Sequence, residues 1–332
     1  MKKILLLMIA LLLATAIDMY LFLNQPMHNT EAVSYELSPG SSVSSMAKQL
    51  KYKGLIKRHY YISLWARLSG QARQLKAGEY KIKVGMTPAQ LLNLMVNAKV
   101  QQYSITLVEG WTIWQMMSQI NASPYLKHTL VENSNEQIMR KIGREGEHPE
   151  GRFYPDTYYF PKGMTDVQFL KRAYSEMSNR LQTAWASRDK NLPFKNAYEA
   201  LIMASIVEKE SALAEERTRI AGVFINRLNK RMRLQTDPTI IYGLGEKFNG
   251  DIRFKDLRND TPYNTYTRRG LPPTPIAMPG QGAINAVMHP DTTEYLYFVA
   301  RGDHSGSHVF STNLKDHEKA VDTFQRKKRS KK

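Results

Sequence analysis

Apolar side chains dominate one segment near the N-terminus, residues 4–23, in which only Thr15 and Asp18 are polar. As a helix rising about 1.5 Å per residue, this segment spans about 30 Å, the thickness of the hydrocarbon core of a bilayer. A cleaved signal peptide has a shorter apolar region, and here the run continues beyond the cleavage-like Ala14-Thr15-Ala16. We therefore predict an uncleaved transmembrane anchor at residues 4–23.

The charges beside this segment predict its orientation. The lysines within residues 1–3 place the short N-terminal end in the cytoplasm, so the rest of the chain faces outward. In a bacterium this is an inner-membrane protein with a periplasmic body. We expect no nucleic-acid partner, because DNA is absent from that compartment.

A second, mixed pattern follows the anchor. Residues 24–34 are polar, contain Pro26 and predict a linker. Residues 35–100 predict a small α+β module, below the usual size of an independent enzyme. Its elements are a helix capped by Ser41 or Ser42, a helix over 60–68, a strand through Tyr80, Ile82 and Val84, and a helix with Thr87 as N-cap and Pro88 at its first position.

Residues 101–324 carry the patterns of a larger mixed α+β domain, followed by a basic tail at residues 325–332. The predicted elements are a strand through Tyr103, Ile105 and Leu107, an amphipathic helix over 166–185, one long helix over 201–228, and strands at 295–300 and 308–310. The fold class predicted for the chain is therefore α+β, with an N-terminal transmembrane helix.

The long helix over 201–228 separates two neighbouring carboxylates. On a helical wheel with about 100° per residue, Glu210 falls in the middle of the apolar stripe, whereas Glu208 falls on the polar arc. A desolvated carboxyl group stays protonated near neutral pH, as a general acid requires. A buried Glu in a structural ion pair is the alternative, and the wheel leaves both open. It also assumes an unbroken helix through Ser211 and Ala212.

Polar and aromatic residues gather downstream in segments whose prolines and glycines indicate irregular backbone. Their hydroxyls, amides and rings offer neutral hydrogen bonds and stacking faces, which suit a carbohydrate better than a phosphate. A well-ordered structural loop is the alternative. Asp237 has either a second charged role or a structural capping role before Pro238. The candidate substrate-binding residues are Gln235, Thr236, Asp237, Tyr263, Asn264 and Tyr266.

Composition narrows the chemistry. The chain has no cysteine, which excludes disulfides, thiol nucleophiles, Cys-bound metals and lipid anchoring through cysteine. Its eight histidines show no metal-binding spacing, and nucleotide-binding and serine-hydrolase motifs are absent, so we expect neither a metal nor a cofactor. His289, His304, His308 and His317 are interpreted as surface and turn residues.

The net charge of +17 is partly a property of the chain ends. The tail carries six of these charges and the N-terminal lysines two, which leaves +9 on the outward body. Such a body suits an anionic polymer or lipid headgroups.

Several motifs together resemble the endolytic murein transglycosylase (YceG-like) family, from the anchor to about Phe324. They are Ala204-Ser205-Ile206-Val207-Glu208-Lys209-Glu210, Val223-Phe224-Ile225-Asn226-Arg227-Leu228, Leu234-Gln235-Thr236-Asp237-Pro238-Thr239, Tyr263-Asn264-Thr265-Tyr266, Gly270-Leu271-Pro272-Pro273 and Tyr295-Leu296-Tyr297-Phe298-Val299-Ala300. The chain departs from the family at Thr274, where many members have Gly, and at Met278, where Asn is common. These differences bear on the detailed structure of the loop and not on the activity.

The resemblance implies that Glu210, the second Glu of the E-K-E motif, is the catalytic acid and base, and that residues 35–100 are a LysM-like module. It implies non-hydrolytic cleavage of peptidoglycan between N-acetylmuramic acid and N-acetylglucosamine, which leaves a 1,6-anhydro end. The implied partners are glycan strands, the inner membrane and peptidoglycan synthases of the penicillin-binding class.

Two other functions remain open at this point. One is a membrane-anchored, non-enzymatic peptidoglycan-binding scaffold in a cell-wall synthesis complex, in which Glu210 is structural. The other is a muramidase-type hydrolase, which would leave reducing ends.

Overall fold

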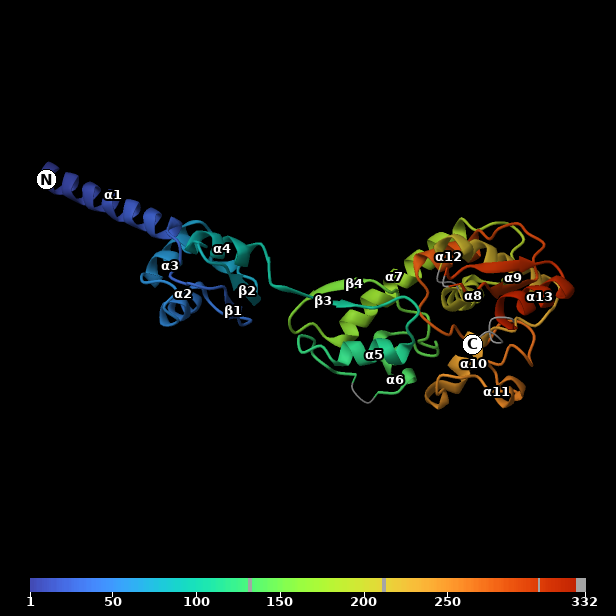
Figure 1. Cartoon of the computed structure of the whole chain (residues 1–332). Helices are drawn as coiled ribbons and strands as arrows, with labels where there is room; N and C mark the ends of the chain where they lie inside the picture. The colour runs from blue at the N-terminus through green and yellow to red at the C-terminus, as the bar shows by residue number, and fades with distance from the viewer. Residues whose placement is uncertain (131–132, 211–212, 304, 327–332) are drawn as a thin grey trace. The chain divides into compact units, whose positions relative to one another are not determined.

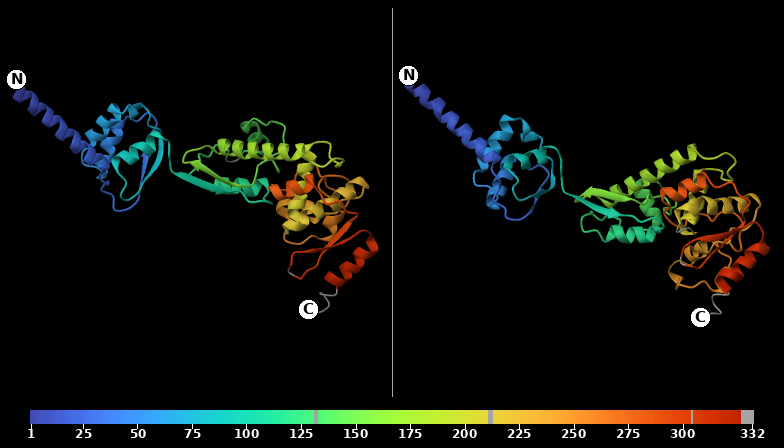
Figure 2. Two further views of the ribbon diagram at one scale, coloured as in Figure 1. Left: turned by 90° about the horizontal axis from the view of Figure 1, so that it is seen from above. Right: turned by 45° about the horizontal axis from the view of Figure 1, so that its top comes forward.

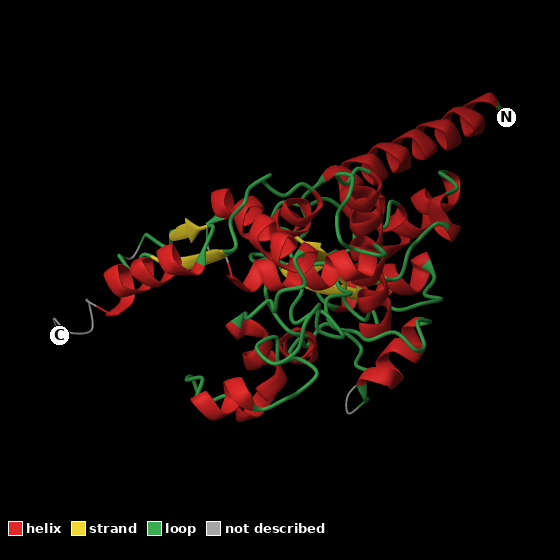
Figure 3. Ribbon diagram, turned by 90° about the vertical axis from the view of Figure 1, so that its right-hand side faces the viewer, coloured by secondary structure: helices red, strands yellow, loops and turns green. Residues whose placement is uncertain are grey.

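The computed structural model describes residues 1–130, 133–210, 213–303 and 305–326. Helices predominate, and the strands form two-stranded sheets (Figure 1, Figure 3). The predicted α+β class is confirmed. The chain divides into two compact units, Met1–Ser104 with Tyr159–Met164, and Ile105–Tyr158 with Thr165–Lys332. Of the predicted basic tail, residues 327–332 lie outside the described residues, as does His304.

The first unit is a helix followed by a small α+β module. Tyr35 and Tyr80 stand opposite each other in an antiparallel pair of strands, and both are buried in the core of the module. The elements of this unit are α1 (Lys2–Asn24), β1 (Val33–Leu37), α2 (Val43–Tyr52), α3 (His59–Leu68), a 3-10 turn (Gln71–Arg73), β2 (Gly78–Ile82) and α4 (Pro88–Val96).

The predicted helix starts in this module are confirmed. Ser42 accepts a hydrogen bond from the Ser45 N–H at 3.1 Å, and Thr87 forms a capping box with Gln90. These side chains satisfy backbone donors that have no partner within a first helical turn. The strand β2 ends at Ile82, earlier than predicted, and leaves Val84 exposed.

Among the described residues, α1 is the one helix long and apolar enough to cross a membrane. Its last turns contact α3 and α4, and Leu23 enters the core of the module. Asp18 forms an ion pair with Arg58 and accepts a hydrogen bond from the Tyr61 hydroxyl at 2.6 Å. Met27, in the segment predicted as a linker, is also buried in this core.

The second unit contains the larger core. It begins in β3 (Gln102–Thr106), which pairs with β4 (Thr157–Pro161). Its other elements are α5 (Ile113–Asn121), α6 (Asn135–Ile142), α7 (Asp166–Ala186), α8 (Ala197–Glu210), a 3-10 turn (Ala214–Glu216), α9 (Arg217–Asn229), α10 (Asp237–Leu244), a 3-10 turn (Gly245–Lys247), α11 (Phe254–Arg258), α12 (Gln281–Met288), β5 (Tyr297–Ala300), β6 (His308–Ser311), α13 (Leu314–Val321) and a π-helical turn (Asp322–Arg326).

Helix α8 lies at the centre of this unit. It packs against α7, α9, α10 and α12, and every residue from Ala200 to Val207 is buried (Figure 2). The antiparallel β5–β6 pair contacts α13. The C-terminal end of α8, Glu208 to Glu210, follows directly after this buried run.

The prediction of one long helix over 201–228 is wrong. Helix α8 ends at Glu210, Ser211 and Ala212 lie outside the described residues, and a 3-10 turn precedes α9. Glu215 and Glu216 stand just before α9, where the helix dipole favours acidic groups. The predicted polar arc of the helical wheel is also wrong, because residues 200–207 of α8 are buried on every side. Ser205, which the wheel placed on the polar arc, is fully buried and accepts a hydrogen bond from the Ile276 N–H.

Candidate functional site

The carboxyl group of Glu210 faces the segment that leads into α10. The buried Thr236 hydroxyl donates a hydrogen bond to Glu210 Oε1. Thr236 is followed by Asp237, the first residue of α10. The structure therefore brings two sequence motifs together, the E-K-E end of α8 and the Q-T-D-P start of α10.

The backbone before α10 is held in place by Thr265. Its Oγ1 accepts a hydrogen bond from the Thr236 N–H at 3.1 Å and lies 2.9 Å from the Thr239 hydroxyl oxygen. Its carbonyl accepts the Gln235 N–H at 3.2 Å. Gln235 adopts a left-handed φ of 50° and has an exposed side chain. These contacts fix the Thr236 hydroxyl against Glu210.

Arg227 of α9 supports the same segment from the other side. It is buried, and it donates to the carbonyls of Leu234 and Leu296 at 2.6 Å each. Its guanidinium lies over the ring of Tyr297, 5.2 Å from the centroid. One side chain thus links α9, the start of α10 and the approach to β5.

The pKa of Glu210 is raised above its ordinary value, and desolvation is the largest cause. The hydrogen bond from Thr236 lowers this pKa, the negative charge of Asp237 raises it, and His308 and Arg227 lower it. A raised pKa increases the protonated fraction of the carboxyl near neutral pH. The group is therefore suited to giving up a proton and then taking one back.

Asp237 and Tyr266 form a second pair beside Glu210. The Tyr266 hydroxyl donates to Asp237 Oδ1 at 2.6 Å, and Asp237 is exposed. Desolvation and this hydrogen bond raise the pKa of Tyr266. The predicted residues Glu210, Thr236, Asp237 and Tyr266 therefore form one connected group, with Gln235 next to it in the chain.

Glu208 does not face solvent as the wheel predicted. Its Oε2 accepts a hydrogen bond from the Gly280 N–H at 3.0 Å, and its Oε1 lies 3.4 Å from Arg217 Nη2. Only 6% of its side chain is exposed. Burial raises its pKa, against the effects of Gly280 and Arg217. The two carboxyl groups therefore differ in their partners and not in which of them is buried. Glu208 forms an ion pair with Arg217, whereas Glu210 has no ion-pair partner among the described residues.

Tyr263 and Asn264 occupy different surroundings from the rest of the predicted group. Asn264 is buried, and its amide donates to the carbonyls of Asp256, Leu257 and Asn259 while its Oδ1 accepts from the Tyr266 N–H. Asn264 therefore clamps the loop, in the sense that its side chain holds the backbone of residues 256–259 against that of Tyr266. The Tyr263 hydroxyl lies 2.8 Å from Thr274 Oγ1, at one of the two positions where the sequence departs from the family pattern.

A row of aromatic rings continues from α10. The Tyr242 ring centroid lies 4.9 Å from that of Tyr263 and 5.8 Å from that of Trp114, whose side chain is exposed. Glu150 is fully buried beside Tyr242, which lowers its pKa, and it accepts a hydrogen bond from the Ile113 N–H at 3.1 Å. Burial raises the pKa of Glu150 to about 7. Sequence reasoning missed Glu150, because its burial depends on α5 and α10.

Sequence reasoning also missed His308, Arg227 and Thr265. His308 was interpreted as a surface or turn residue, yet its Nδ1 lies 2.7 Å from Glu216 Oε2 and both side chains are nearly buried. His289 is exposed beside Asp189, in agreement with the prediction, and His317 stacks on Tyr297. Arg227 and Thr265 lie within motifs of the family resemblance, but nothing local in these motifs indicates long-range hydrogen bonds.

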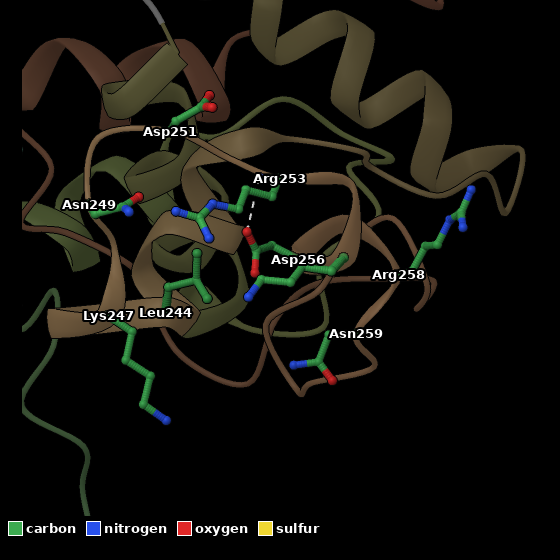
Figure 4. A pocket seen from close by; sticks show the side chains of 9 residues that line it. Leu244, Lys247, Asn249, Asp251, Arg253, Asp256, Arg258 and Asn259 are labelled. Atoms are coloured by element: carbon green, nitrogen blue, oxygen red, sulfur yellow. Dashed lines mark hydrogen bonds between the residues drawn. The ribbon is translucent and has the colours of Figure 1, made fainter.

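An open cavity of about 750 Å³ lies beside α10 and α11, and Glu210 is not among its lining residues (Figure 4). It contains none of the predicted site residues, and Asp256 on its wall accepts a hydrogen bond from the Arg253 N–H at 2.9 Å. Its lining residues are Leu244, Lys247, Asn249, Asp251, Arg253, Lys255, Asp256, Arg258 and Asn259. Within the described ranges, no three or more His, Asp or Glu side chains are grouped to hold a metal ion.

Comparison with known proteins places the chain among bacterial relatives. It is 33% identical over 309 residues to an endolytic murein transglycosylase of Bacillus subtilis, covering 88% of this chain and 84% of that protein. It is 28% identical over 322 residues to an endolytic murein transglycosylase of Streptococcus pneumoniae, covering 87% of this chain and 58% of that one.

A crystal structure of a yceG-like protein from Listeria monocytogenes is similar at 31% sequence identity with a TM-score of 0.57, over 88% of this chain and 99% of that chain. A family model described as the YceG-like family matches residues 35–323. The match spans the small module, the Glu210 group and the final β5–β6 pair. The protein therefore belongs to the YceG-like family.

Proposed function

We propose that this protein is a peptidoglycan lytic transglycosylase, a lyase that cuts glycan strands internally with Glu210 as the single acid and base. The observation that carries the proposal is the state of Glu210: a carboxyl with a raised pKa, no ion-pair partner among the described residues, and a fixed hydroxyl against one oxygen. The relatives named as endolytic murein transglycosylases support the reaction class.

In the first step, protonated Glu210 gives its proton to the glycosidic oxygen between N-acetylmuramic acid and N-acetylglucosamine. The bond from C1 of the muramic acid to that oxygen breaks, and the N-acetylglucosamine leaves with a new hydroxyl. Positive charge develops at C1 and the ring oxygen, and the Glu210 carboxylate now stands beside it. The raised pKa of Glu210 favours this step, since it keeps the proton available near neutral pH.

In the second step, the C6 hydroxyl of the same muramic acid attacks C1, and Glu210 takes the proton that this hydroxyl loses. The product is a 1,6-anhydro end, and Glu210 is protonated again. A hydrolase generally needs two carboxylates, one of them to activate water or act as nucleophile. Here the substrate supplies its own nucleophile, and intramolecular attack gains a large effective molarity. One Glu therefore suffices.

The remaining predicted residues would bind and orient the sugar. The exposed Gln235, with Asp237 and Tyr266, offers hydrogen-bonding groups beside Glu210, while Thr236 holds the carboxyl itself. Tyr263 adds a ring connected to the aromatic row of Tyr242 and Trp114, and Asn264 acts through the loop that it clamps.

The proposed location is the bacterial inner membrane, with α1 as a single-pass anchor, the N-terminus in the cytoplasm and the second unit outside. Its support is the length and apolar character of α1 and the lysines at its start. The module over residues 35–100 is proposed to be LysM-like and to contact glycan. Peptidoglycan synthases are the proposed protein partners, because a cut in new glycan must follow its synthesis.

The test is the mass of the products released from uncrosslinked glycan by the purified protein. Products lighter by one water than those of a hydrolase mean lytic transglycosylation, reducing ends mean a muramidase, and no cleavage favours the scaffold. Glu210→Gln should abolish cleavage while the protein stays folded. The matched control is Glu215→Gln, an exposed carboxylate in the same region, which should cleave at the normal rate. Full activity of Glu210→Gln would overturn the assignment.

A further inference from the structure

Helix α3 presents an exposed apolar face although it belongs to a compact module. Tyr60, Leu64 and Leu68 lie one helical turn apart along one line, with exposed fractions of 53%, 44% and 70%. Trp65, 39% exposed, lies on the other side of Tyr61. The buried face of the same helix, with Ile62 and Ala66, already packs into the core. Nothing in the fold of the module requires the outer side chains to be apolar.

Tyr61, which lies between these exposed residues on α3, contacts the apolar helix α1. The hydroxyl of Tyr61 donates to Asp18, and its ring centroid lies 5.7 Å from that of Phe22. Arg58, just before α3, completes the contact through its ion pair with Asp18. The exposed face of α3 is therefore continuous with the end of α1, where Tyr20 and Leu21 are exposed as well.

The length of α1 sets the level of this contact. Residues 2–17, the part of α1 before Asp18, rise about 24 Å at about 1.5 Å per residue. The hydrocarbon core of a bilayer is about 30 Å thick. If Lys2 and Lys3 lie at the inner surface, Asp18 comes to about 6 Å below the outer edge of that core, and the last turns of α1, where Phe22 meets Tyr61 of α3, cross into the outer interfacial layer. Tyr and Trp are enriched at that level, because their rings are apolar and their polar atoms can reach water.

We propose that the face of α3 formed by Tyr60, Leu64, Trp65 and Leu68 lies in the outer interface of the membrane that α1 crosses. The module then has two membrane contacts, a spanning helix and an interfacial one, and its orientation to the bilayer is fixed. Lys57 and Arg67 are exposed next to this face and suit anionic headgroups. The inference deepens the proposed location of the protein and is independent of the proposed reaction.

The absence of cysteine makes a direct test possible with the full chain. A single cysteine is introduced by Leu68→Cys, labelled with an environment-sensitive fluorophore and placed, one copy per disc, in nanodiscs of phosphatidylethanolamine and phosphatidylglycerol. Lipids with a nitroxide near the headgroup and aqueous iodide are the two quenchers. Lys81→Cys, exposed on β2, is the matched control, and Leu12→Cys reports insertion of α1.

We expect the label at position 68 to be quenched several times more strongly by the nitroxide lipid than the label at position 81, and to resist iodide. If position 68 responds to iodide like position 81 while position 12 resists iodide, α1 is inserted and the proposal is wrong. Protection of position 68 from both quenchers means a protein occupant and also overturns it. Iodide quenching at position 12 overturns the insertion of α1 together with the proposal.

A second variant checks that the apolar side chains cause the contact. Leu64→Glu and Leu68→Glu together leave the buried residues Tyr61, Ile62 and Ala66 unchanged, so the module should stay folded. With the label at Tyr60→Cys, the double substitution should turn lipid quenching into iodide quenching. Unchanged lipid quenching would show that α1 alone sets the position. Cleavage of soluble glycan, measured in parallel, tests the proposed reaction separately.

Discussion

The chemistry proposed for this protein depends on the balance of groups around one carboxyl. Desolvation raises the pKa of Glu210, the Thr236 hydroxyl lowers it and the Asp237 charge raises it. The two neighbours are consecutive in the chain but act in opposite directions. This arrangement lets single substitutions move the pKa of Glu210 up or down without touching the residue itself.

Two nearly isosteric substitutions should therefore shift the pH dependence of cleavage in opposite directions. The acid step needs protonated Glu210, so activity falls as the pH rises through its pKa. Thr236→Val removes the hydrogen bond that favours the charged form and should move this falling limb to higher pH. Asp237→Asn removes a repelling negative charge and should move it to lower pH.

The measurement is kcat/KM for glycan cleavage across the pH range, with Thr236→Ser as the control that keeps the hydroxyl. A shift of both variants in the same direction, or no shift, would contradict the electrostatic role of these residues. A lower kcat/KM with an unchanged pH profile would mean that Thr236 and Asp237 only position the substrate.

Glu210 should also reduce stability at alkaline pH. Its folded-state pKa is raised above the unfolded value, so the folded state retains a proton that the unfolded state has released. Stability is then lost as the pH rises above the unfolded value near 4.5 through the folded pKa. Glu210→Gln should therefore raise the Tm relative to the unchanged protein at pH 8, with little difference at pH 4. Glu215→Gln should show no such trend.

At the level of elements, Glu150 joins the start of α5 to α10. It is fully buried, it accepts the Ile113 N–H, and Tyr242 lies beside it. Its position holds the aromatic row of Tyr242 and Trp114 together. Because burial raises the pKa of Glu150 to about 7, its carboxyl group loses a proton within the physiological pH range.

Substitution of Glu150 should change stability in a pH-dependent way. The folded pKa of about 7 exceeds the unfolded value of 4.5, so stability falls between these pH values, by on the order of 3 kcal/mol once the group is fully ionised. Glu150→Gln should flatten that fall in urea unfolding between pH 5 and pH 8. Glu150→Leu should destabilise by about 1–3 kcal/mol at pH 5, because the Ile113 N–H loses its acceptor, and this deficit should shrink toward pH 8, because Leu cannot ionise. Identical pH profiles for Glu150→Gln and the unchanged protein would refute the assigned ionisation.

At the scale of the whole molecule, the groups around Glu210 all belong to the second unit, whereas the apolar helix belongs to the first. The proposed anchor and the proposed reaction therefore use different parts of the chain. None of the groups that set the pKa of Glu210 lies in α1.

A chain lacking residues 2–17 should therefore cleave soluble, uncrosslinked glycan at close to the normal rate. The truncation keeps Asp18 with Arg58 and Leu23 in the core, so the module should remain folded. The rate of product formation, measured beside the full chain in detergent, checks this expectation. Loss of cleavage with a normal circular dichroism spectrum would mean that α1 takes part in substrate handling.

The features that could be predicted from the sequence are those that neighbouring residues control. The apolar run of α1, the caps at Ser42 and Thr87 and the apolar run that predicts β5 depend on residues a few positions apart. The predicted helix starts at Val43, Pro88 and Asp166 agree with the structure for that reason. The helical wheel could not show that α8 and α9 are separate helices, because a wheel imposes one continuous period on all the residues placed on it.

The sequence by itself determined the α+β class, the apolar helix, the module and the motif that singles out Glu210, since local periodicity and residue identity carry that information. Only the tertiary structure decided which carboxyl has partners. Glu208 is paired with Arg217 and Gly280, Glu210 meets Thr236, and Asn264 clamps a loop. The reason is physical: desolvation and hydrogen bonding depend on which groups of a folded chain come within a few ångströms, and these groups lie far apart in sequence.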